Sequence, residues 1–381
     1  MIFYVVPKTV MISAGEASGE LYGAMLSREI KNIWPDTVIF GIGGQKMEKE
    51  GVELIARISS VIGFIEAVRH LAEIRRTFKT ASNTIFTRKP DLLVLIDYPD
   101  FNLALAKKAK SQGIPILYYV SPQVWAWRSG RIKKIAALVN RMAVLFPFEV
   151  ALYEQSGLPC EFVGHPIAET INITRTREEI KKDLGLDPER PLIALLPGSR
   201  PAELQRHMPL IQDVARRVQK ELPGHQIAVP LADGTKLPHS LDSYLTVYQN
   251  RTREVVAACD AAAVASGTAT LETALLETPM VVFYRISPIT YLFRFLVKVK
   301  FISLVNLLAD REVVVELLQH EATPDRIYNE LKRILSDTAY RAEMIAGMKG
   351  IRALMKGKTP SARVAHIAGE VAGWGLPASQ S

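Results

Sequence analysis

The stretch LLVLIDYPDFN, residues 92–102, places five apolar residues directly before two aspartates that flank a tyrosine and a proline. A short, continuous apolar run is typical of a parallel strand that is buried on both faces. Pro99 cannot extend the strand ladder because it lacks an amide hydrogen. We therefore predict a buried strand that ends at Asp97, followed by a helix whose N-cap is Asp100.

The same alternation of short apolar runs with longer amphipathic segments predicts strands and helices along the chain. It occurs in two series, separated by a polar segment near Pro166. We predict two doubly wound, Rossmann-like α/β domains, residues 1–166 and 167–345, and a helical tail over residues 346–381. The runs expected to form strands are KTVMIS, TVIFGIG, DLLVLID, PILYYV, RMAVLF and CEFVG, then PLIALLP, QIAVPLA, YLTVYQ, CDAAAVAS and PMVVFYR.

Composition limits the classes of function. A chain of 381 residues fits two domains better than one core. The net charge of +8 indicates an anionic partner: nucleic acid, a phosphorylated metabolite or a membrane surface. Two cysteines indicate a reducing compartment. We find no convincing secretory signal, spanning helix, metal-binding histidine cluster, dinucleotide fingerprint or Walker motif, and therefore expect no metal.

Ligands of doubly wound sheets bind beyond the carboxyl ends of the strands, so the residues there are candidates for function. Asp97 is a candidate general base at the edge of a cleft, with a surface ion pair as the alternative. The small residues of SAGEASGE, residues 13–20, allow close approach of a ligand, and Ser18 could cap the next helix. Trp125 and Arg128 combine a flat ring with a cation, which suits a sugar or an acyl-phosphate.

In the second domain, two strand-to-helix junctions indicate a phosphate site. The first, LLPGSRPAEL, has a tight turn at Gly198 and Ser199, and Arg200 can bind a phosphate with its forked guanidinium. The second, ASGTATLE, offers backbone amides and hydroxyls at the start of a helix, and one turn later Glu272 can accept bonds from a ribose diol. The residues expected at the second junction are Ser266, Gly267 and Thr268.

Two apolar segments are candidates for contact with a membrane. Residues 284–312 mix aromatic and basic side chains, so that on a helix Arg294 and Lys298 lie on one side and Phe295 on another. The stretch VIGFIEAVRHLAEI, residues 61–74, adds apolar surface that includes Phe64. Both segments could instead be core-facing helices.

Taken together and in order over residues 10–319, these motifs resemble the lipid-A-disaccharide synthase family. The resemblance implies a GT-B fold in which the last helix crosses back onto the first domain. It also implies an inverting transfer of 2,3-diacylglucosamine from UDP-2,3-diacylglucosamine to 2,3-diacylglucosamine 1-phosphate, without a cofactor. The motifs that carry it are SAGEASGE, IDYPDFN, YVSPQVWAWR, FPFE, FVGHP, LLPGSR, ASGTATLE, PMVVFYR and LVNLLADREVVVELLQ.

The resemblance assigns roles residue by residue. Asp97 becomes the base that deprotonates the acceptor, and Glu272 binds the ribose. Arg200 and the helix near Gly267 stabilise the departing UDP. The residues expected on the acceptor side are Glu16, Ser18, Trp125 and Arg128, and Asn306 lies in a matching motif.

The resemblance also implies partners. It predicts a peripheral protein at the inner face of the cytoplasmic membrane, and it allows a homodimer. Lipid phosphates and an anionic membrane then account for the positive charge, so no nucleic-acid partner is expected. The alternative left open is another UDP-sugar GT-B enzyme, such as a peptidoglycan-precursor glycosyltransferase or a UDP-sugar 2-epimerase. A two-lobed binding protein and a nicotinamide dehydrogenase fit less of the sequence.

Overall fold

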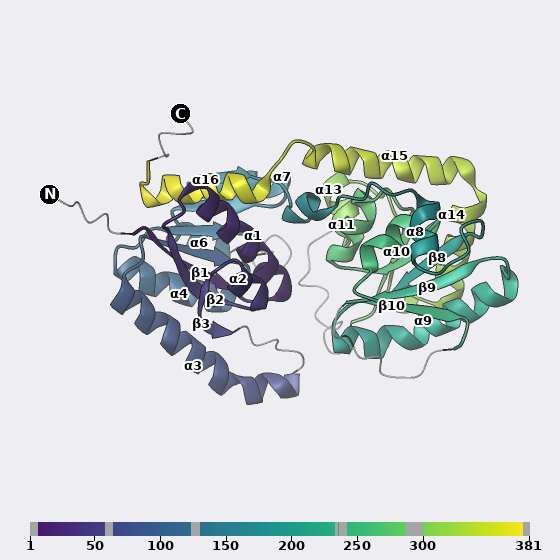
Figure 1. The fold of residues 1–381 in the computed structure, drawn as a ribbon, viewed down its shortest axis with the longest axis horizontal. Coiled ribbons are helices and arrows are strands. Elements are labelled where there is room, and N and C mark those ends of the chain that lie inside the picture. The colour runs from purple at the N-terminus through teal and green to yellow at the C-terminus, as the bar shows by residue number, and fades with distance from the viewer. Residues whose placement is uncertain are drawn as a thin grey trace. The chain divides into compact units, whose positions relative to one another are not determined.

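The chain forms two compact units in a computed structural model (Figure 1). The structure describes residues 7–57, 64–122, 130–232, 235, 242–286 and 300–375, without the side chains of residue 17 and residues 64–71. The first unit comprises residues 1–166 and 357–381, and the second comprises residues 167–356.

The described residues of the first unit form a seven-stranded parallel sheet with the order β3-β2-β1-β4-β5-β6-β7. The strands are β1 (Thr9–Ala14), β2 (Val38–Gly43), β3 (Glu53–Arg57), β4 (Leu92–Ile96), β5 (Ile116–Tyr119), β6 (Arg141–Val144) and β7 (Cys160–Phe162). The helices are α1 (Ala17–Ile33), α2 (Gln45–Lys49), α3 (Phe64–Arg88), α4 (Pro99–Ser111), α6 (Arg131–Ala136), α7 (Pro147–Glu154) and α16 (Pro360–Ala372).

Helices cover both faces of this sheet. Every residue of β4 is buried, as the continuous apolar run predicts, and successive side chains point to opposite faces. On one face, Met11, Leu93 and Tyr118 pack in a core with side chains of α3, α4, α6 and α7. On the other, α16 packs against α1, β4 and β5 (Figure 1). The predicted return of the last helix to the first domain is confirmed.

Four charged side chains fasten α16 to the sheet. Arg363 donates to both oxygens of Glu161 on β7, at 2.6 and 2.8 Å. Arg141 on β6 donates to Glu161 at 2.8 Å and to Glu370 of α16 at 2.6 Å. Arg363 also donates to Glu370 at 3.0 Å. Bidentate arginine–carboxylate pairs in a network are stronger than isolated surface ion pairs.

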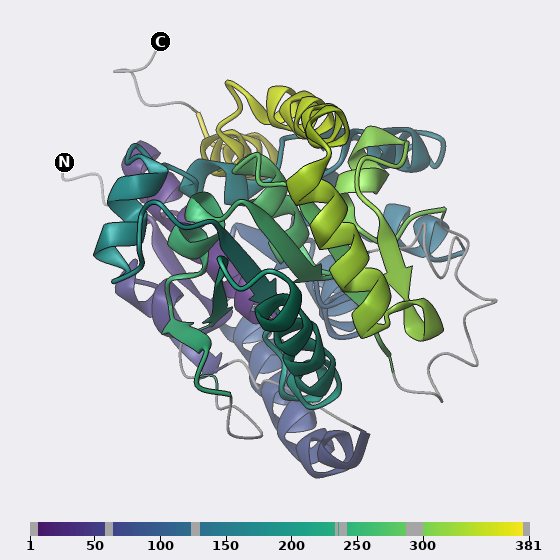
Figure 2. The same ribbon diagram turned by 90° about the vertical axis from the view of Figure 1, so that its right-hand side faces the viewer.

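The second unit has a parallel sheet with the order β10-β9-β8-β11-β12-β13 among its described residues, again with helices on both faces (Figure 2). The strands are β8 (Leu192–Leu196), β9 (Gln226–Leu231), β10 (Leu245–Gln249), β11 (Ala261–Ala265), β12 (Met280–Tyr284) and β13 (Glu316–Leu318). The helices are η1 (Pro166–Thr170), α8 (Arg177–Asp183), α9 (Pro201–Glu221), α10 (Thr252–Ala258), α11 (Thr268–Leu275), α13 (Leu304–Ala309), η3 (Gln319–Glu321), α14 (Pro324–Ser336) and α15 (Thr338–Met355).

The sequence predictions fail at some boundaries. The edge strands β3 and β13 are absent from the predicted set, because neither is a continuous apolar run: charged residues bound β3 at both ends, and Glu316 begins β13. Asp100 is not an N-cap: α4 begins at Pro99, its N-cap is Tyr98, and Asp100 pairs with Arg131 from within the first turn. Ser18 likewise lies inside α1, whose N-cap is Glu16.

Candidate functional site

Each sheet reverses its strand order at one point, and the loops that carry Asp97 and Arg200 follow strands at these two points. In the first unit the reversal falls between β1 and β4, where Ala14 pairs with Ile96. In the second unit it falls between β8 and β11, where Leu196 pairs with Val264. Loops on either side of such a switch point diverge and leave room for a ligand.

Asp97 lies in a strained turn at the end of β4. Asp97 and Tyr98 both adopt left-handed backbone conformations, with φ of 49° and 48°. This region is uncommon for residues other than glycine, and strain of this kind persists only where the surroundings impose it. Asp97 is partly buried, and its backbone amide donates to the carbonyl oxygen of Tyr119 at the end of β5, at 3.3 Å.

Two side chains impose this conformation by binding the carbonyl oxygen of Asp97. The Asn102 amide donates to it at 2.7 Å, and the Tyr118 hydroxyl donates at the same distance. Asn102 is fully buried and its own carbonyl oxygen accepts from the Ser13 hydroxyl at 2.7 Å. Residues of β1, β5 and α4 therefore all help to fix the backbone of Asp97.

The neighbouring loop after β1 fits closely against the same turn. A Cβ atom on Gly15 would lie 2.2 Å from Cγ of Tyr98, so only glycine allows this approach. Burial first, and then the charges of Glu16 and Asp100, raise the pKa of Tyr98. Glu16 is exposed and Ser18 is partly buried at the start of α1. The structure thus brings Glu16 to the sheet edge that carries Asp97.

In the second unit, a buried carboxylate organises the turn after β8. Oε2 of Glu203 accepts from the backbone amides of Ser199 and Arg200, at 3.1 and 3.2 Å. Oε1 accepts from the Tyr284 hydroxyl at 3.0 Å. Gly198 has a φ of 106°, and a Cβ there would lie 2.6 Å from Oε2 of Glu203. These two backbone amides are already satisfied by the chain. The Arg200 side chain is 57% exposed, and its Nη1 lies 3.5 Å from Oε1 of Glu203.

His207, one turn after Glu203 on α9, ties together the ends of β8 and β12. Its Nδ1 is 2.7 Å from the carbonyl oxygen of Pro197, and its Nε2 is 3.1 Å from the backbone nitrogen of Arg285. Burial lowers the pKa of His207, so the ring is neutral near pH 7. Nδ1–H then donates to Pro197 and Nε2 accepts from Arg285.

The second junction begins α11 next to the same switch point. Ser266 is the first residue after β11, Gly267 is the N-cap, and Thr268 opens the helix. The first amides of a helix lack partners within it and attract anions. Glu272 points from the same helix with its side chain 20% exposed, and Arg253 of α10 donates to its Oε1 at 3.0 Å.

Asn306 has a different place from the other predicted residues. It is fully buried in α13, where its amide nitrogen donates to Val314 and Glu316, both at 2.8 Å. Its carbonyl oxygen accepts from the amides of Val313 and Val314, at 2.8 and 3.0 Å. The Asn306 side chain therefore connects α13 by hydrogen bonds to residues 313–316, at the start of β13.

Several predicted residues lie outside the described part of the chain. Phe64 begins α3, but its side chain is not described. The residues outside the described ranges are Trp125, Arg128, Arg294, Phe295 and Lys298.

Among the described residues, no group of histidine, cysteine, aspartate and glutamate side chains could hold a metal ion. None of the described helices combines the length and the apolar character that a membrane span requires.

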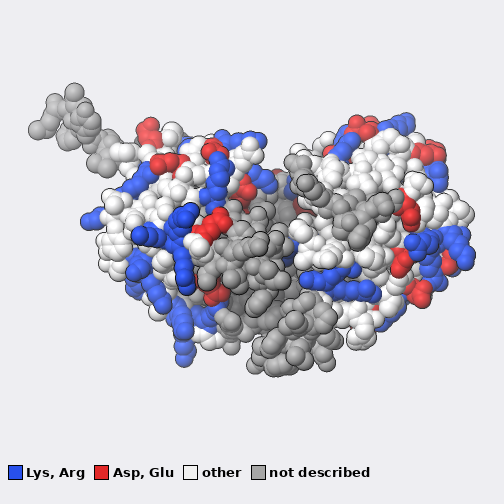
Figure 3. Space-filling view, turned by 90° about the horizontal axis from the view of Figure 1, so that it is seen from below, with Lys and Arg blue, Asp and Glu red and all other residues white. Residues whose placement is uncertain are grey.

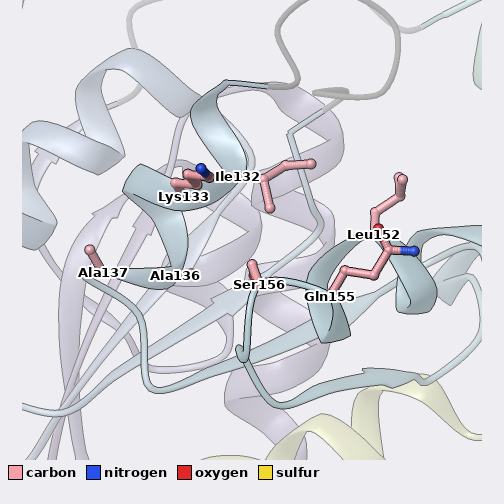
Figure 4. Close-up of a pocket in the computed structure, with 7 residues that line it drawn as sticks. All are labelled: Ile132, Lys133, Ala136, Ala137, Leu152, Gln155 and Ser156. Carbon is pink, nitrogen blue, oxygen red and sulfur yellow. The ribbon is translucent and has the colours of Figure 1, made fainter.

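A shallow cavity of about 640 Å³ lies between α6 and α7 of the first unit (Figure 4). Ile132 and Leu152 project into it from the two helices, with Lys133 at its edge. None of the predicted site residues lines this cavity.

Comparison with known proteins decides the family. A family model described as lipid-A-disaccharide synthetase matches residues 10–365. A lipid-A-disaccharide synthase of Geobacter metallireducens is 45% identical over 375 residues, which cover 96% of this chain and 98% of that protein. One from Coxiella burnetii is 40% identical over 366 residues, covering 94% of this chain and 97% of that protein.

The chain belongs to the lipid-A-disaccharide synthetase family.

This membership confirms the prediction of a lipid-A-disaccharide synthase, a glycosyltransferase of lipid A biosynthesis, made from the sequence motifs. Solved structures agree with the GT-B fold. A UDP-GlcNAc 2-epimerase from Neisseria meningitidis has a TM-score of 0.60 at 11% identity, covering 92% of this chain and all of that one. MurG of Acinetobacter baumannii has a TM-score of 0.57 at 13% identity, covering 96% and 100%. At such identities the likeness supports the fold alone.

The sequence analysis of this family member missed the residues that hold the predicted ones in place. In the first unit, Asn102 and Tyr118 fix the backbone of Asp97. In the second, Glu203 and His207 fix the turn before Arg200, and Arg253 contacts Glu272. Buried polar residues one turn apart, as at Glu203 and His207, are the sequence signal that could have found part of this set.

Proposed function

We propose that the protein transfers 2,3-diacylglucosamine from UDP-2,3-diacylglucosamine to 2,3-diacylglucosamine 1-phosphate. The products are a β-1,6-linked disaccharide 1-phosphate and UDP. The proposal rests on one observation above the others: Asp97 is held in a strained left-handed turn at a switch point of a chain of this family. Glu277 and Asp310 also have a positive φ, but each follows a helix, whereas Asp97 follows a strand at the switch point. Backbone strain that the fold maintains at such a position is typical of a functional site.

In the proposed mechanism Asp97 acts as the general base. Its carboxylate takes the proton from the acceptor 6-hydroxyl while that oxygen attacks the anomeric carbon of the donor. The bond from this carbon to the UDP oxygen breaks, and the configuration inverts. General-base assistance of this kind contributes roughly 10²–10⁴-fold in rate.

The second unit has the chemistry to hold the donor. Arg200 and the first amides of α11 can bind the diphosphate, whose negative charge increases as UDP departs. Glu272 can accept bonds from the ribose hydroxyls. Ser199 contributes through its place in the turn, because Glu203 already occupies its amide. Glu16, Ser18, Trp125 and Arg128 are proposed on the acceptor side.

We further propose that the protein acts on the inner face of the cytoplasmic membrane, where both lipid substrates would lie. The first unit supports this with exposed Arg75, Arg76 and Lys79 on α3. Figure 3, seen from the side on which α3 lies lowest in Figure 1, shows Lys and Arg prevailing over Asp and Glu on the face of this unit. Phe64, Arg294, Phe295 and Lys298 stay proposed membrane contacts, and a homodimer stays a prediction.

The direct test is incubation with both acylated precursors. Mass spectrometry should detect the disaccharide 1-phosphate, and UDP should be released in equal amount. The competing acceptor is a lipid-linked muropeptide, which a peptidoglycan-type enzyme would use. Transfer to that acceptor, or UDP release without any disaccharide, would contradict the proposal.

A further inference from the structure

Arg253, on the first turn of α10, is bound on two sides. Its Nε donates to Oε1 of Glu272 at 3.0 Å, and its Nη2 lies 3.0 Å from the same oxygen. On the other side, Nη1 donates to the backbone carbonyl of Thr170 at 2.9 Å. Thr170 ends η1, and the Arg253 side chain is 34% exposed. A planar guanidinium bound at both edges cannot rotate to follow another partner.

This geometry leaves one side of the Glu272 carboxylate open. An ionised carboxylate offers about four acceptor positions on two oxygens, and Arg253 binds only Oε1. Oε2 makes no hydrogen bond to a described residue. A ribose diol presents two adjacent hydroxyl donors, which match the two oxygens of one carboxylate. Binding both hydroxyls requires a fixed carboxylate plane, and glutamate alone has three rotatable bonds that would have to be ordered.

We propose that Arg253 is a positioning residue for nucleotide recognition: it fixes the plane of the Glu272 carboxylate so that this carboxylate binds the two ribose hydroxyls of the donor. The inference rests on the proposed function, since it takes a uridine nucleotide as the donor. Arg253 does not contact the nucleotide in this arrangement, and its effect passes through Glu272. Its contribution therefore depends on the ribose hydroxyls and vanishes when the ligand lacks them.

The test compares two ligands, UDP and 2′,3′-dideoxy-UDP, by calorimetric titration of the full chain. For the native protein, UDP should bind more tightly than the dideoxy nucleotide. In Arg253→Ala, binding of UDP should weaken about tenfold, in the range expected for a hydrogen bond to a charged group, while binding of the dideoxy nucleotide stays nearly unchanged. Unchanged dideoxy binding also demonstrates that the variant is folded.

Three further variants sharpen the result. Glu272→Ala should abolish the preference for UDP, and adding Arg253→Ala to it should cause no further loss. Arg253→Lys keeps the positive charge but lacks the several N–H donors of the planar guanidinium, so it should recover only part of the preference for UDP over the dideoxy nucleotide. The matched control is Arg251→Ala: Arg251 lies two residues away but pairs with Asp183, so the preference should be intact.

The outcomes separate the inference from the function on which it rests. Equal weakening of both nucleotides in Arg253→Ala would overturn the inference, because the arginine would then act through charge or through the fold. Full UDP affinity in that variant would overturn it as well. If the native protein bound no UDP at all, the proposed donor would fail, and the inference would fail with it.

Discussion

The side-chain amide of Asn102 donates a 2.7 Å hydrogen bond to the backbone carbonyl of Asp97, five residues earlier. The asparagine thus fixes the backbone of Asp97 without using the aspartate carboxylate. The Tyr118 hydroxyl binds the same carbonyl from β5. The strained turn at Asp97 and the side chains that restrain it therefore come from one short motif and the adjacent strand.

Replacing Asp97 with asparagine should remove the proposed base without changing the size of the side chain. We expect kcat to fall by roughly 10²–10⁴-fold, and the affinity for UDP to stay within about twofold. Single-turnover assays and calorimetry measure the two quantities. Asp100→Asn is the matched control: Asp100 is 82% exposed and pairs with Arg131, so this variant should keep its activity. Full activity in Asp97→Asn would remove this residue from the base role.

Asn102→Ala should release the strained turn. It leaves the Ser13 hydroxyl without its buried partner and removes one of two donors to the Asp97 carbonyl. We expect a loss of about 1–3 kcal/mol in the free energy of unfolding and at least a tenfold fall in kcat. Asn140→Ala, which removes an acceptor for the Ile116 amide in the same unit, should lower stability only. Equal kcat in the two variants would show that Asn102 is merely structural.

Glu203→Gln should disorder the turn that presents Arg200. Glutamine has one acceptor oxygen and no charge, so when this oxygen accepts from the backbone amides the side chain can meet the Tyr284 hydroxyl only as a donor, and the ion pair between Glu203 and Arg200 is lost. We expect UDP binding to weaken about tenfold, with a smaller change in kcat. Glu221→Gln, at the exposed end of α9 where it pairs with Arg217, is the control and should bind UDP normally. Normal UDP binding by Glu203→Gln would mean that the turn orders itself without this carboxylate.

The network that fastens α16 makes a pH-dependent prediction. Hydrogen bonds from Arg363 are the largest cause that lowers the pKa of Glu161. Because the pKa is lower in the folded state, this stabilisation is complete above the ordinary value of about 4.3 and is lost as pH falls through the folded value. Glu161→Gln should therefore lower Tm at pH 7 and lose most of this difference in strong acid. Thermal unfolding of both proteins against pH measures it; an equal deficit at every pH would exclude ionisation as the cause.

Membrane attachment can be tested by charge reversal on α3. Each basic residue near an anionic surface contributes roughly 1 kcal/mol, so changing Arg75, Arg76 and Lys79 to glutamate should weaken binding to phosphatidylglycerol vesicles by about 100-fold or more. Changing three exposed lysines of the second unit, Lys182, Lys220 and Lys332, is the control for net charge. Vesicle flotation at two salt concentrations gives the readout. Equal losses in both variants would point to overall charge rather than to α3.

The sequence predicts most of the fold because buried parallel strands leave continuous apolar runs, as in β4 and β8. It misses β3 and β13, where charged residues interrupt the apolar run. Asp97, Arg200 and Glu272 can be proposed as candidates from the sequence because they come after predicted strands. The residues that hold them in place cannot, because the relevant contacts join residues far apart in the sequence: Ser13 and Asn102 are separated by 89 positions, and Thr170 and Arg253 by 83. Sequence patterns report local structure, whereas these contacts depend on how strands are ordered in the sheet.

The return of α16 to the first sheet has a consequence for synthesis in the cell. The helix that completes the first unit is encoded after the whole of the second. A chain emerging from the ribosome can therefore finish its second half while the unit bearing Asp97 still exposes the apolar surface that α16 will cover. The half translated first is the last to mature.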